Sequence, residues 1–184
     1  MEGTSPEGLL KALDAAATAA KQAGDMSQTA TIYSQLAATQ AALGNGDVAH
    51  QTIQVANGLG GTVPWNVHYF DAMAHGQLKH WAPAEDELAK LKATKGAPPS
   101  RVAALTGYLL TQQGKPADAL TILMASDTTD LIVMNNIAAA HAALGHAQEA
   151  AKWWTRINTN NQLSLQDYTN VNSRRRARLA LAKK

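Results

Sequence analysis

The chain has 184 residues, of which 46% are hydrophobic, so it is long enough for one domain or one short repeat array with a buried core. It has no cysteine, which excludes disulfides, thiol catalysis and cysteine-ligated metal sites. The formal net charge is +2, but six of the sixteen basic residues lie within 174–184, which leaves ten basic against fourteen acidic residues elsewhere. A nucleic-acid-binding domain usually spreads its cations over one face, so this distribution argues against nucleic acid as a partner.

The N-terminal residues and the low content of charged residues indicate in which cellular compartment the protein is expected. No apolar run approaches the roughly 18 residues that a membrane span needs, so no span is expected. The first residues show neither a basic nor an apolar signal-peptide region. Charged residues make up only 16%, where about a quarter is usual, so neutral polar groups solubilise the surface. This composition slightly favours the bacterial periplasm or cell envelope over the cytoplasm.

Apolar residues recur at three- and four-residue spacing along nearly the whole chain, which predicts helices and no strands. Glycine and proline divide this pattern into segments, and Asp47 is placed to cap the third helix. The predicted helices cover approximately 7–23, 28–43, 48–59, 65–79, 82–95, 100–113, 116–126, 130–144, 147–158 and 164–182. The sequence therefore predicts an all-α protein of about ten helices.

An internal repeat runs through the middle of the chain. An alanine lies five residues after each helix-to-helix turn, at Ala49, Ala84, Ala119 and Ala150. Four residues later comes a larger apolar residue, and twelve residues earlier a small one, at Ala37, Ala72, Gly107 and Ala138. The small residues allow the two helices of a hairpin to approach closely. Lys79 stands in one turn where the repeat has glycine.

This pattern resembles the tetratricopeptide repeat, most clearly from Asn135 to Ala150 and again from Tyr33 onward. The resemblance implies a right-handed α–α superhelix of four hairpins, at about 28–63, 64–98, 99–128 and 129–161. A leading helix within 1–27 and a basic capping helix within 162–184 would flank them.

Proteins of this family are mostly non-enzymatic interaction modules that bind a peptide or protein partner in a concave groove. The groove is lined by the first helix of each hairpin. Carried onto this sequence, the predicted partner-binding groove comprises Asn66, Tyr69, Met73, Gln77, Arg101, Tyr108, Thr111, Gln112 and Asn135. Tyrosine and arginine are common binding hot spots, so truncating Tyr69 and Tyr108 is expected to weaken binding without unfolding. By analogy, the protein would be a scaffold or assembly factor of a bacterial envelope, secretion or pilus machine.

Two alternatives use other surfaces. A cytosolic chaperone or adaptor for a secreted substrate would dimerise through helix 7–23. A binder of anionic lipid or RNA would use the basic C-terminal helix. The residues of this possible secondary surface are Trp153, Arg174, Arg175, Arg176 and Arg178. The sequence leaves open the identity of the partner, the compartment and the choice between monomer and dimer.

Motifs for catalysis or cofactors are not found. The sequence has no phosphate-binding loop, no Gly-x-Ser-x-Gly elbow and no His-Glu-x-x-His. The pairs His75/His80 and His141/His146 are five residues apart, whereas helical ligands share a face at a spacing of three or four. We therefore expect these histidines to be packing residues, and we expect no metal, no cofactor and no enzymatic activity.

Overall fold

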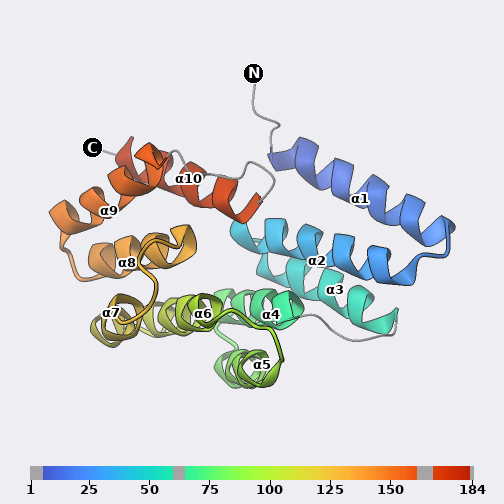
Figure 1. Cartoon of the computed structure of the whole chain (residues 1–184), viewed down its shortest axis with the longest axis horizontal. Coiled ribbons are helices and arrows are strands. Elements are labelled where there is room, and N and C mark those ends of the chain that lie inside the picture. The colour runs from blue at the N-terminus through green and yellow to red at the C-terminus, as the bar shows by residue number, and fades with distance from the viewer. Residues whose placement is uncertain (1–5, 60–64, 161–167, 183–184) are drawn as a thin grey trace. The chain divides into compact units, whose positions relative to one another are not determined.

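In this computed structural model the described residues are 6–59, 65–160 and 168–182, and their regular structure is entirely helical (Figure 1). The helices are α1 (Pro6–Gln22), α2 (Met26–Ala42), α3 (Gly46–Gly58), α4 (Trp65–Gln77), α5 (Trp81–Ala93), α6 (Pro99–Gln112), α7 (Pro116–Met124), α8 (Leu131–Ala143), α9 (Ala147–Thr159) and α10 (Tyr168–Leu181). The prediction of an all-α protein is confirmed for these residues. None of these helices is both long and apolar enough to cross a bilayer.

The helix ends lie within a few residues of those expected. Of the predicted last helix, the part 164–167 lies outside the described residues, as do 1–5 and the two C-terminal lysines of the basic segment, 183–184. The predicted cap of the third helix is wrong, because Asn45 is the N-cap of α3 and Asp47 lies in its first turn. The aspartates that do cap are Asp25, before α2, and Asp130, before α8.

The chain forms two compact units, Met1–Lys95 (unit 1) and Gly96–Lys184 (unit 2). Unit 1 contains α1 to α5, and unit 2 contains α6 to α10. Within each unit, consecutive helices pack on one another, as Figure 1 shows. Alternate helices also meet, α2 with α4 in unit 1, and α6 with α8 and α8 with α10 in unit 2. Each unit is therefore built from hairpins that stack in chain order.

The hairpin turns share one backbone feature. Gly44, Gly114 and Gly145 adopt φ values of 88°, 77° and 78°, in the left-handed region that favours glycine. Lys79 occupies the equivalent turn with φ 59°, and it is the one non-glycine residue with positive φ in the described ranges. Lys79, which stands where the other repeats have glycine, therefore adopts the backbone conformation that glycine has in the other turns.

The repeat alanines are fully buried. Ala49, Ala84, Ala119 and Ala150 are at most 1% exposed. Gly107 is the small residue of the third repeat, and a Cβ added to it would lie 2.5 Å from Cγ of Leu123. Helices α6 and α7 can therefore approach this closely only because residue 107 has no side chain. The small residue of the third repeat therefore lies at a close helix contact, as its spacing predicted, and Leu123, expected in the seam between hairpins, contacts Gly107 of its own hairpin.

Candidate functional site

Unit 1 holds four residues of the predicted groove, all on α4. Tyr69 and Met73 are buried, and Asn66 is half-buried. Gln77 is also half-buried, and its Nε2 donates a hydrogen bond to the carbonyl oxygen of Ala41. That bond joins α4 to α2, so Gln77 contributes to the internal packing of unit 1.

Unit 2 holds the other five, Arg101, Tyr108, Thr111 and Gln112 on α6 and Asn135 on α8. Nη1 of Arg101 lies 2.7 and 2.6 Å from the two carboxylate oxygens of Asp130. Asp130 also caps α8, so Arg101 is already paired inside the unit. The hydroxyl of Thr111 donates to the carbonyl of Gly107 in the same helix. Gln112 is exposed and Asn135 is 4% exposed.

The burial of the two groove tyrosines changes what their truncation would test. Tyr69 is 2% exposed and Tyr108 is 8% exposed. Truncation of either ring would remove core volume together with any binding contact. Loss of binding in such variants would therefore not locate a partner surface.

A cleft of about 330 Å³ opens in unit 2 between α8, α9 and α10. Its walls combine apolar groups with one amide and one guanidinium. The lining residues are Asn135, Ala139, Trp154, Arg176, Leu179 and Ala180. This cleft brings together a residue of the predicted groove, Asn135, with one of the possible secondary surface, Arg176.

The four arginines of α10 divide into two pairs. Arg174 donates from Nη2 to the carbonyl oxygen of Asn160, and Arg178 donates from Nε to Oδ1 of Asn158 at 3.2 Å. These two fasten α10 to the C-terminal end of α9. Arg175 and Arg176 are exposed, and neither makes a hydrogen bond or ion pair with any residue that the structure describes.

The tandem tryptophans of α9 lie beside the unit 2 core. Trp153 and Trp154 are half-buried and pack against a cluster formed by Leu131, Met134, Ile157 and Ala177. Because Ala177 belongs to α10, this cluster joins the last helix to the hairpin α8–α9. The guanidinium of Arg156 lies 5.3 Å from the Trp153 ring centre, within the range of a cation–π contact.

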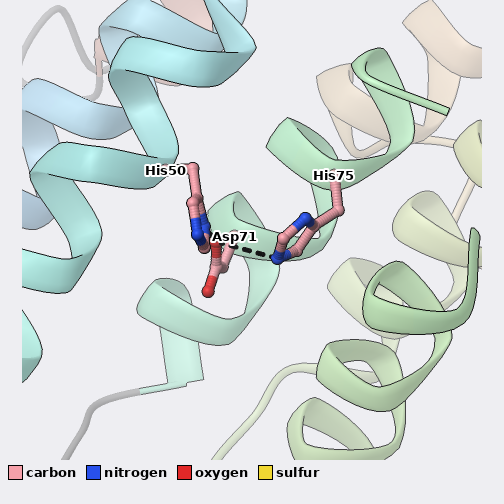
Figure 2. A group of neighbouring side chains, drawn as sticks. All are labelled: His50, Asp71 and His75. Atoms are coloured by element: carbon pink, nitrogen blue, oxygen red, sulfur yellow. Dashed lines mark hydrogen bonds and ion pairs between the residues drawn. The ribbon is translucent and has the colours of Figure 1, made fainter. Parts of the chain in front are cut away.

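Unit 1 contains a polar cluster that joins α3 to α4 (Figure 2). Nδ1 of His50 lies 2.6 Å from Oδ1 of Asp71, and Nε2 of His75 lies 3.7 Å from the same oxygen. The Asp71 side chain is only 5% exposed, that of His75 12% and that of His50 30%. The carboxylate is therefore almost fully buried between two imidazoles, one of which reaches water.

The electrostatics of this cluster favour a neutral His75. Burial lowers the pKa of His75 below its usual 6.5. The Asp71 carboxylate acts in the opposite direction, while His50 and His80 lower the pKa further and Glu87 raises it. Nδ1 of His75 is buried without a hydrogen-bond partner among the described residues.

Sequence reasoning missed this cluster because it compared histidines only with histidines. Asp71 and His75 are four residues apart, one helical turn, and that spacing was visible in the sequence. His50 lies 21 residues before Asp71 and joins it only because α3 packs on α4. No local spacing predicts that third member.

Comparison with known proteins adds no assignment. No family model, no curated protein and no solved structure matches the chain. The resemblance to the tetratricopeptide repeat thus stays a prediction that depends on the spacing of the repeat residues.

Proposed function

We propose that this chain is a non-enzymatic interaction module of the tetratricopeptide type, which binds a short acidic segment of a partner protein. The segment would lie in the cleft between α8, α9 and α10. One observation carries this proposal: Arg176, exposed and without a partner among the described residues, lines the same cleft as Asn135 and Trp154.

The packing order of the helices supports the first part of the proposal. In unit 2, α8 contacts both α6 and α10, so alternate helices form a row. Repeat proteins built in this way contact only their neighbours and expose one continuous face of such helices to partners. Asn135 and Ala139 lie on α8, the middle helix of this row.

The chemistry of the cleft indicates the ligand. A guanidinium binds a carboxylate through charge-assisted hydrogen bonds. The Asn135 amide can both donate to and accept from a peptide backbone. Trp154 and Leu179 offer apolar surface for a neighbouring side chain. The expected ligand is therefore a peptide in which aspartate, glutamate or a terminal carboxylate stands next to an apolar residue.

The proposal can be tested with a displayed library of random short peptides, selected on the full chain. Selected peptides are then synthesised and titrated calorimetrically against four proteins: wild type, Arg176→Gln, Ala139→Leu and Arg175→Gln. Arg176→Gln removes the cleft cation, and Ala139→Leu fills the cleft. Arg175→Gln is the matched control, because it removes the same charge from an exposed neighbour that does not line the cleft.

We expect the selected peptides to be acidic. Arg176→Gln and Ala139→Leu should each weaken peptide binding about tenfold or more, whereas Arg175→Gln should change the affinity little. Added salt should weaken wild-type binding, because Arg176 is exposed. Equal losses for the two arginine variants, with Ala139→Leu unaffected, would instead indicate a general anionic-surface binder. Peptides without acidic residues would contradict the proposal.

A further inference from the structure

Two imidazoles and one carboxylate converge in unit 1 from two different helices. Figure 2 shows His50 from α3 turned toward Asp71 and His75 from α4. One ligand atom from each residue can be chosen so that all three lie within 4.8 Å of one another. Nitrogen from histidine and oxygen from aspartate are ligands that first-row transition metals accept.

The distances fit an ion after small side-chain rotations. Around tetrahedral Zn²⁺, with bonds of about 2.0–2.2 Å, neighbouring ligand atoms lie roughly 3.3 Å apart. The contact of His50 with Asp71, at 2.6 Å, is shorter than this, and that of His75 with Asp71, at 3.7 Å, is longer. The His50 side chain is 30% exposed, so it has room to withdraw.

His75 provides a second, independent observation. Its side chain is 12% exposed, yet Nε2, the nitrogen that faces Asp71, lies 3.7 Å from Oδ1, beyond hydrogen-bond distance of the carboxylate. Buried polar atoms normally have partners.

We propose that His50, Asp71 and His75 bind one divalent transition-metal ion of the Zn²⁺ type. The ligand atoms are Nδ1 of His50, Oδ1 of Asp71 and Nε2 of His75, and water completes the coordination from the side of His50. The ion takes the place of the hydrogen between Nδ1 of His50 and Oδ1 of Asp71; the imidazole then carries its remaining hydrogen on Nε2, and a ring that began doubly protonated releases one proton to solvent. It would link α3 to α4, and so fasten one hairpin of unit 1 to the next.

The experiment uses the full chain without a histidine tag, stripped with EDTA and dialysed. Zn²⁺ is titrated in competition with a chromophoric chelator, and the bound metal is counted by elemental analysis. The variants are His50→Gln, His75→Gln and Asp71→Asn. The matched control is His141→Gln, because His141 is also half-buried near the end of a hairpin's first helix but lies beside His146 instead of a carboxylate.

The expected result is one equivalent of Zn²⁺ for the wild type and for His141→Gln. His50→Gln and His75→Gln should each weaken binding by about 10- to 100-fold or more. His50 is the most exposed of the three, so His50→Gln should fold even if the buried Asp71→Asn does not. Circular dichroism of each variant checks the fold.

The inference is overturned if the wild type takes up no stoichiometric Zn²⁺. It is equally overturned if folded His50→Gln binds Zn²⁺ as the wild type does, or if His141→Gln loses binding to the same extent. The result is independent of the peptide-binding proposal, because no residue of the unit 2 cleft is changed.

Discussion

The hairpins α4–α5 and α8–α9 have the same helix boundaries, shifted by 66 residues, yet they hold different cores. Asp71 lies where α8 has Ile137, and both positions are buried. His75 matches His141, and Lys79 matches Gly145. One hairpin thus places a carboxylate and a strained turn at positions where the other has an aliphatic side chain and glycine.

The comparison distinguishes the features that both hairpins share from the polar residues that only α4–α5 contains. The shared features are helix length, turn position and the buried alanines Ala84 and Ala150, and they suffice for the architecture. A buried carboxylate costs desolvation unless it is paired, and α8 forms the same helix without one. The polar cluster of unit 1 is therefore an addition to what the architecture needs.

The largest test exchanges the central residues of the two hairpins. Ile137→Asp should destabilise the protein by about 3 kcal/mol or more, because the new buried carboxylate would have no partner in the position of His50. The repeat places Leu120 at that position in unit 2. Asp71→Ile should cost about 1.5 kcal/mol, the value of one charged hydrogen bond, because the His50 side chain is 30% exposed and can hydrogen-bond to water instead. Urea unfolding of both variants measures the difference. Equal costs would mean that the two positions are not distinct environments.

An intermediate test concerns the turns. Lys79→Gly should stabilise the protein by about 1 kcal/mol, because glycine adopts φ 59° without the steric cost that lysine bears. Gly145→Lys, the same exchange in the other hairpin, should destabilise it by a similar amount. Thermal and urea unfolding of both variants give the values. No change for Lys79→Gly would show that the turn is not strained at that residue.

The smallest effect is the pH dependence of the two matched histidines. Burial lowers the pKa of His75 and of His141 in the folded state. The unfolded chain then binds the proton more tightly, so stability is full above about pH 6.5 and falls as the pH drops through the folded pKa. His75→Gln and His141→Gln should each lose less stability on acidification, by at most about 1.4 kcal/mol per pH unit.

These measurements are made in EDTA, so that metal does not compete with protons. Urea unfolding from about pH 7 to pH 5 gives the slopes for both variants and the wild type. A steeper loss in either variant than in the wild type would mean that folding raises the pKa of that histidine instead of lowering it.

Much of the fold could be predicted, because it depends on short-range signals. The helical spacing of apolar residues predicted the helices, and the glycines predicted the turns. The small residue Gly107 predicted a close approach of the two helices of its hairpin, and the structure contains that approach. The odd lysine at position 79 was visible as an exception to the repeat and holds the turn conformation of glycine.

The candidate sites were harder to predict from the sequence, because they depend on which polar side chains hydrogen-bond to or form ion pairs with one another. Arg101 was predicted to face a partner, but it binds Asp130, which lies 29 residues later in the chain. Gln77 was assigned to the same groove and donates to Ala41 on a different helix. Nothing in the local pattern distinguishes a polar residue that awaits a ligand from one that already has an internal partner.

The neighbour-only packing has a consequence for synthesis. Within each unit, every contact between described helices joins helices one or two apart in the chain. A nascent chain can therefore complete α2 and α3 on the ribosome before α4 has emerged. Such short loops close quickly and expose little unpaired surface while they wait. The order of packing thus allows the chain to add hairpins to the fold in the order in which they are synthesised, each on the face of the one before it.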